Sequence, residues 1–143
     1  MRTFGEFYRE TTKGRKDLIT KEPPRNKGEF SIVQDLFGWK IQSGKYFIKC
    51  RSEEEARYLK VYFDIGVTEI KVPKDLEYLK SILPDLENIK RKTDEIIEEV
   101  IGGIISERQR EMARSRIYMD LMYDEEDEED EEKVEEEEEV KEE

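Results

Sequence analysis

The chain has 143 residues, of which 45% are charged and 35% hydrophobic, and its net charge is −12. The length suits a single domain. With no histidine and one cysteine, the chain excludes an internal disulfide and the common zinc ligand sets, so we expect neither a metal nor a cofactor.

The negative charge is concentrated at the C-terminus. Residues 120–143 contain 17 acidic and 2 basic residues, which leaves a net charge of +3 for residues 1–119. A run of this kind repels itself and has little to bury, so residues 123–143 are predicted to form a disordered acidic tail. Three roles remain open for it: a solubilising tail, a tethered competitor that screens the adjacent arginine cluster from nucleic acid, or a segment that engages a basic partner.

Hydropathy and composition favour a soluble protein. No stretch approaches the roughly 20 apolar residues that span a bilayer, and the N-terminal MRTFGEFYRE lacks the apolar core of a signal peptide. We therefore expect a cytoplasmic protein that does not associate with membranes. Abundant Lys, Arg and Glu beside scarce Asn and Gln resemble proteins from hot environments, in which ion-pair networks are favoured.

Residues 1–28 are polar and carry 8 basic and 4 acidic residues. Phe4, Phe7 and Tyr8 have helical spacing and suit one short docking turn. The Pro23-Pro24 pair then disfavours regular structure. We predict a partly ordered basic arm.

Residues 29–74 are predicted to form a small α/β module. The run 29–34 is rich in strand formers, and the alternating runs 37–42 and 45–50 flank a Ser43-Gly44 turn, which indicates a β-hairpin. On the hairpin, Phe37, Trp39 and Ile41 are expected on one face of the first strand, and Tyr46, Ile48 and Cys50 on one face of the second.

A helix and a last strand complete this module. Ser52 and Glu55 form a capping box at the start of the helix, and Gly66 suits the residue that follows its end. Strand 67–72 is expected next, paired in parallel with the strand before the helix through a right-handed crossover. The fold class is therefore α+β: a small mixed sheet followed by a helical region and the acidic tail.

Residues 75–122 have helical periodicity. Asp75 is the expected N-cap, and Pro84 is expected to break or kink the helix. Gly102-Gly103 weakens it again, and Ser106 with Gln109 forms a second capping box. We therefore predict breaks near 84 and at 102–105, and a last helix over about 107–122. The alternative at Gly102-Gly103 is one unbroken helix with a close-packed glycine patch.

Between residues 86 and 105 the apolar residues recur at spacings of three and four and form a wide stripe. A small sheet does not need so much apolar surface, so we expect part of the stripe to bind a partner helix or a second copy of the chain. The stripe residues are Leu86, Ile89, Ile96, Ile97, Val100, Ile101 and Ile104.

Two basic clusters, one within residues 13–16 and the other within residues 108–116, are candidates for binding nucleic-acid phosphates. In the second cluster Arg110 and Arg114 share one side of the helix and Arg108 and Arg116 the other, interleaved with apolar residues. That pattern suits an interface helix, or arginines paired with the acidic tail, better than a helix that reads a groove. The candidate residues are Lys13, Arg15, Lys16, Arg108, Arg110, Arg114 and Arg116.

No motif for catalysis is present. The common general base, histidine, is absent, and Cys50 lies in an apolar-faced strand without a partner to activate it. Glu69 and Lys71 form an isolated E-x-K pair, and the sequence lacks a Gly-rich phosphate loop or a nucleophile elbow. We expect no catalytic residues, no small-molecule substrate and no enzyme.

The run YFIKCRSEEEARYLKVYFDIGVTEIKVPKDLEYL, followed by DEIIEEV, resembles segments at the C-terminal end of some restriction–modification DNA methyltransferases. In those segments a strand, a Ser-capped helix, a Pro-ended strand and an Asp-Glu-Ile-Ile helix follow one another. The resemblance covers about half the chain and includes none of the methyltransferase catalytic or cofactor motifs. It implies an accessory module linked to DNA modification.

Two functional hypotheses follow. The leading one is a non-enzymatic interaction module that self-associates, or binds a protein partner, through the stripe. The alternative is a nucleic-acid-associated accessory protein that uses the basic arm and the arginine cluster and is regulated by the acidic tail.

Overall fold

The computed structural model describes residues 2–25 and 28–123, so the predicted disordered tail lies outside the described residues. The α+β class is confirmed, with four helices and five strands over these ranges. The elements are α1 (Phe4–Thr12), β1 (Leu18–Lys21), β2 (Ser31–Asp35), β3 (Gly38–Ser43), β4 (Tyr46–Cys50), α2 (Glu53–Asp64), β5 (Ile70–Pro73), α3 (Leu76–Ile101) and α4 (Glu107–Met122).

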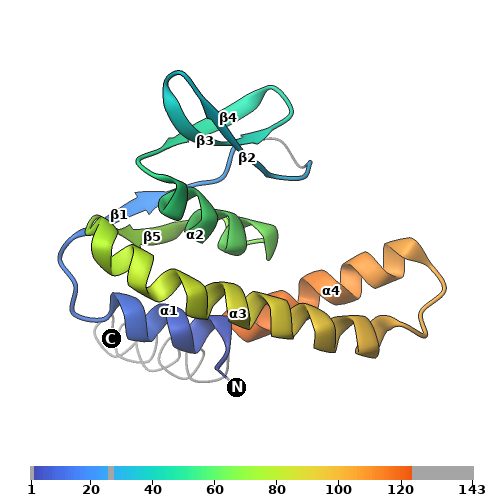
Figure 1. The fold of residues 1–143 in the computed structure, drawn as a ribbon. Coiled ribbons are helices and arrows are strands. Elements are labelled where there is room, and N and C mark those ends of the chain that lie inside the picture. The colour runs from blue at the N-terminus through green and yellow to red at the C-terminus, as the bar shows by residue number, and fades with distance from the viewer. Residues whose placement is uncertain (1, 26–27, 124–143) are drawn as a thin grey trace, which may run out of the picture.

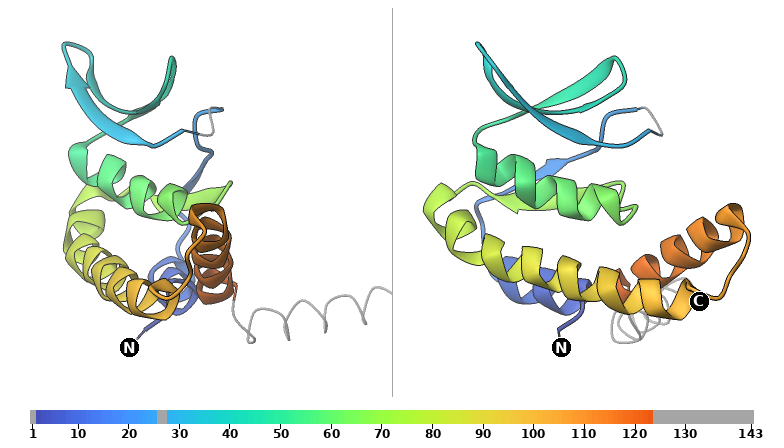
Figure 2. Two further views of the ribbon diagram at one scale, coloured as in Figure 1. Left: turned by 90° about the vertical axis from the view of Figure 1, so that its right-hand side faces the viewer. Right: turned by 45° about the vertical axis from the view of Figure 1, so that its right-hand side comes forward.

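The elements are stacked in three tiers (Figure 1). The β2–β3–β4 sheet forms one outer tier, α2 and the β1–β5 ribbon form the middle, and α1, α3 and α4 form the other outer tier (Figure 2). Helix α2 contacts both sides, because it packs against α3 and against the three-stranded sheet. Its side chains Ala56, Tyr58, Leu59 and Tyr62 are fully buried, so α2 is the centre of the hydrophobic core.

The expected mixed sheet with a parallel crossover is wrong. Every described strand pairing is antiparallel, and β5 pairs with β1, with Val72 opposite Ile19. The hairpin is confirmed, with Ile41 opposite Ile48. The crossover fails because α2 separates two sheets, with β4 in one and β5 in the other.

Both ends of α2 follow local rules. The Ser52 side chain accepts a hydrogen bond from the Glu55 amide at 3.1 Å. At the other end Gly66 has φ +99°, and the amides of Gly66 and Val67 donate to the carbonyls of Phe63 and Tyr62 at 3.0 Å each. This is the Schellman arrangement, which satisfies the last carbonyls of the helix.

The N-terminal segment is part of the body over its described residues and does not form the expected arm. Thr3 caps α1 by accepting a hydrogen bond from the Glu6 amide at 3.1 Å, and Phe4 and Phe7 are buried in the core. Helix α1 packs against α3 and α4. The helical spacing of the aromatic residues therefore indicates a core helix.

Helix α3 runs through Pro84 without the predicted break. Pro84 is exposed, and the buried Leu83 and Leu86 beside it anchor both flanking turns in the core. This packing offsets the loss of one backbone hydrogen bond. The helix ends at Ile101, and α4 begins after Ser106, which accepts from the Gln109 amide at 3.4 Å.

Candidate functional site

The predicted apolar stripe divides between the core and the surface. Its residues Leu86, Ile89, Ile97 and Ile101 are buried in the protein's own core, and Ile104 is partly buried against it. Ile96 and Val100 are exposed. The surface part of the stripe is therefore confined to the last turns of α3.

Helices α3 and α4 form a hairpin whose arms diverge toward the 102–106 connection (Figures 1 and 2). Exposed apolar residues occur on both helices and in the connection at this end of the hairpin. Val100 is 65% exposed, Met112 64% and Ile105 95%. We call Ile96, Val100, Ile105 and Met112 the tip patch.

The other end of the hairpin, its base, is fixed to the body. Tyr118 is buried and its hydroxyl donates to Asp94 of α3, while Arg114 donates to Glu98 at 2.8 Å. Burial, followed by the hydrogen bond to Asp94, raises the pKa of Tyr118. Met122 at the end of α4 is buried.

Charged residues border the tip patch on both arms of the hairpin. Residues four apart on a helix lie on one face, so Met112 lies between Arg108 and Arg116 on α4. Both arginines are exposed, and neither forms an ion pair with any residue that the structure describes. On α3, the exposed Glu99 adjoins Ile96 and Val100. Arg108 and Arg116 therefore flank Met112 on α4, together with the exposed Glu111, and Glu99 lies beside Ile96 and Val100 on α3.

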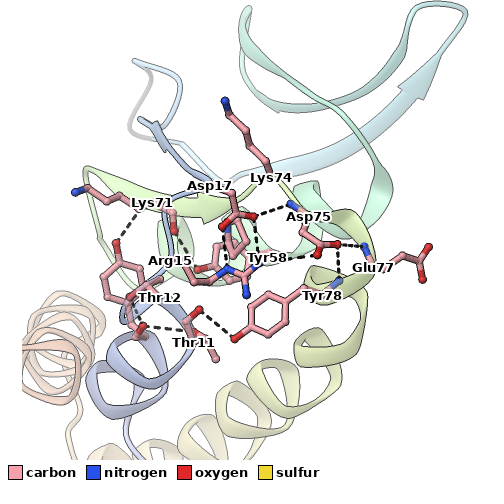
Figure 3. Close-up of polar contacts among 12 residues, drawn as sticks. Thr11, Thr12, Arg15, Asp17, Tyr58, Lys71, Lys74, Asp75, Glu77 and Tyr78 are labelled. Atoms are coloured by element: carbon pink, nitrogen blue, oxygen red, sulfur yellow. Dashed lines mark hydrogen bonds and ion pairs between the residues drawn. The ribbon is translucent and has the colours of Figure 1, made fainter.

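In the first predicted basic cluster, Arg15 is engaged inside the protein (Figure 3), whereas Lys13 and Lys16 are exposed. Arg15 donates to both carboxylate oxygens of Asp17, at 2.9 and 3.1 Å, and its guanidinium lies 3.8 Å from the centre of the Tyr78 ring. Asp17 also accepts from the Asp75 amide at 3.1 Å. The hydrogen bond from Arg15 lowers the pKa of Asp17. Arg15 therefore ties the α1–β1 loop to the start of α3.

The seven basic candidates do not form one surface. The α1–β1 loop, which carries Lys13, Arg15 and Lys16, lies at the opposite end of α3 from the start of α4 (Figure 1). Arg110 is engaged with Glu107 at 2.7 Å and with the Ile104 carbonyl at 3.2 Å. Arg15, Arg110 and Arg114 therefore have partners within the protein. These seven residues therefore do not make a continuous phosphate-binding surface.

Sequence reasoning missed Ile105 and Met112 of the tip patch. Their periodicity gives no signal, because Ile105 lies in a connection and α4 has no single apolar face. Sequence reasoning also placed Phe37 on a strand face, whereas it lies in the β2–β3 turn and is exposed.

The tip patch consists of isoleucine, valine and methionine side chains, which supply no acid, base or nucleophile for catalysis. Cys50, which lies in β4, is also unsuited to nucleophilic catalysis. Burial raises the pKa of Cys50 to about 11, so this thiol stays protonated at neutral pH.

Within residues 2–25 and 28–123, no group of three His, Cys, Asp or Glu side chains lies close enough together to hold a metal ion. None of the helices in the described ranges is both long and apolar enough to cross a lipid bilayer.

Comparison with protein-family models, with curated proteins and with solved structures found no match in any of the three. The resemblance to methyltransferase segments therefore stays a prediction.

Proposed function

We propose that the protein is a non-enzymatic interaction module that self-associates through the tip patch, in the cytoplasm. The observation that carries this proposal is the exposure of Val100, Ile105 and Met112 at the diverging end of the α3–α4 hairpin. Apolar side chains gathered on one protruding element are typical of association sites.

The charges at the patch favour a second copy of the chain as the partner. In a two-fold pair the same surface meets itself, so each residue contacts its counterpart's neighbours reciprocally. The Arg108–Met112–Arg116 face of one copy is complementary to the Ile96–Glu99–Val100 face of the other. Such a contact buries the apolar residues of both copies and places arginines beside a carboxylate twice.

Light scattering coupled to size-exclusion chromatography tests this proposal on the full chain over a micromolar concentration series. We expect a dimer that dissociates on dilution, and a monomer for the Met112→Glu variant, because its carboxylate would be buried against the Ile96–Glu99–Val100 face without a basic partner. Leu36→Glu is the matched control, since Leu36 is 99% exposed in the β2–β3 turn and its replacement should leave the dimer intact.

A charge exchange tests the arrangement. Arg108→Glu should weaken the dimer by placing it against Glu99, and Glu99→Arg in the same chain should restore it. A wild-type chain that remains monomeric at every concentration, or a Met112→Glu variant that still dimerises, would contradict the proposal.

A further inference from the structure

The β2–β3–β4 sheet has an outer face that the core does not use. Ile32, Ile41 and Ile48 lie opposite one another in register and pack toward the core. Side chains alternate along a strand, so the residues between them point away from α2. This outer sheet face carries Val33, Lys40, Gln42, Phe47 and Lys49.

A hollow of about 390 Å³ lies on this face, lined in part by Phe37, Phe47, Lys40 and Lys49. The Phe37 ring stands at the β2–β3 turn with 90% of its surface exposed. Its backbone is held in place, because the Phe37 amide donates to Asp35 at 2.8 Å. The hollow is therefore lined by three aromatic residues, Phe37, Trp39 and Phe47, and the backbone of Phe37 is held in place.

Lys40, Lys49 and Asp35 line the hollow, and Lys45 lies in the β3–β4 turn at the other end of the sheet. Residues 31–50 contain three lysines (Lys40, Lys45 and Lys49) and one acidic residue, Asp35, so this segment is positive in a chain whose net charge is −12. Lys40 lies 3.0 Å from Asp35 and 4.6 Å from the centre of the Phe47 ring. Lys45 and Lys49 are exposed and form no ion pair with any residue that the structure describes.

We infer that the outer sheet face binds single-stranded nucleic acid, with bases stacked on Phe37 and Phe47 and phosphates held by Lys45 and Lys49. Stackable rings within a positive surface are the combination that single strands require, since every base has a face that stacks on an aromatic ring. A duplex is the poorer ligand, because its bases are already stacked on one another and the rings cannot reach their faces. The inference is independent of self-association, which uses the other end of the molecule.

Fluorescence anisotropy with a labelled oligothymidine, and with a duplex of the same length, tests the inference on the full chain at low salt. We expect binding of the single strand in preference to the duplex. Phe37→Ala should weaken it between about 5-fold and 150-fold, the range for losing one stacking ring. The neighbouring Leu36→Ala is the matched control, because Leu36 is equally exposed but has no ring.

The salt dependence tests the phosphate contacts. Each lysine–phosphate contact contributes about −0.7 to the slope of log K against log salt for a single strand, so Lys49→Glu should make the slope shallower by at least that amount. Lys80→Glu makes the same charge change at an exposed position of α3. It should leave the slope nearly unchanged, because it alters only the net charge of the protein and no phosphate contact.

Three results would overturn the inference. The first is no binding of the single strand at low salt. The second is duplex binding as tight as single-strand binding, with Phe37→Ala without effect. The third is an equal loss in Phe37→Ala and Leu36→Ala, which would assign the effect to the turn and not to stacking. Thermal unfolding of each variant shows whether the sheet has remained folded.

Discussion

The base and the tip of the α3–α4 hairpin are built from similar residues but differ in what covers them. At the base Tyr118 and Met122 are buried and α1 packs against both helices. At the tip Val100 and Ile105 lie in solvent. The difference arises from the length of α1 and α2, because these helices reach the base and stop short of the tip.

This difference separates stability from association within one helical hairpin. Residues at the base contribute to the folded monomer, because unfolding exposes them. Residues at the tip are exposed in the monomer already, so they contribute mainly to contacts with another molecule. The following variants test that division, beginning with the largest expected effect.

Leu86→Ala should lower the free energy of unfolding by about 2–5 kcal/mol, because it leaves a cavity where a fully buried side chain packs. Val100→Ala on the same helix should change it by less than about 0.5 kcal/mol. Guanidinium unfolding at low protein concentration measures both values. Equal losses for the two variants would show that the tip is as well packed as the base.

Gly5→Ala tests the junction of α1 with the end of α4. A Cβ atom at Gly5 would lie 2.3 Å from the Met122 carbonyl oxygen, so α1 must shift away from α4. We expect a loss of about 1–3 kcal/mol, typical of overpacking, although alanine is otherwise the better helix former.

Gly103→Ala is the matched control for this junction. A Cβ atom there meets nothing within 4 Å, and the residue lies in the connection at the tip. Its free energy of unfolding should match that of the wild type. A stable Gly5→Ala variant would mean that α1 and α4 do not meet closely in solution.

Tyr118→Phe removes the hydroxyl that donates to Asp94 at the base, and should cost about 0.5–1.5 kcal/mol. The variant also changes the response to high pH. Burial and the Asp94 hydrogen bond raise the pKa of Tyr118 above its ordinary value of 10.0. The stability that this group contributes is therefore present below pH 10 and is lost as the pH rises through the higher pKa of the folded state.

Urea unfolding from pH 8 to pH 11 measures this effect. The wild type should lose stability above about pH 10. Tyr118→Phe should lose less, because it lacks the contribution of Tyr118. The loss that remains comes from Tyr8, Tyr58 and Tyr62, whose pKa values are also raised. Identical pH profiles for the two proteins would contradict the assigned hydrogen bond.

Features set by neighbouring residues could be predicted from the sequence. The β3–β4 hairpin, the Ser52 and Ser106 caps and the glycine at position 66 depend on residues within a few positions, and each is found where the pattern indicates. Local hydrogen bonding and turn chemistry determine them, and the rest of the fold does not have to be known.

Features set by distant residues could not be predicted. Strand β1 pairs with β5, about fifty residues away, and four residues carry too little pattern to indicate such a partner. Arg15 was expected to bind phosphate, yet its partners Asp17 and Tyr78 converge only when α3 folds against the α1–β1 loop. Periodicity likewise defined the stripe on α3 but not which of its residues other elements would cover.

The smallest expected effect on stability is that of Ile105→Ser, which replaces a side chain that is 95% exposed. At low protein concentration its Tm should equal that of the wild type. Self-association stabilises the folded state by mass action, so the wild-type Tm should rise with protein concentration. Ile105→Ser should flatten that rise, because it removes apolar surface only from the associated state. A variant that shows the same concentration dependence as the wild type would place the self-association surface outside the tip, and a lower Tm at every concentration would instead make Ile105 part of the monomer's packing.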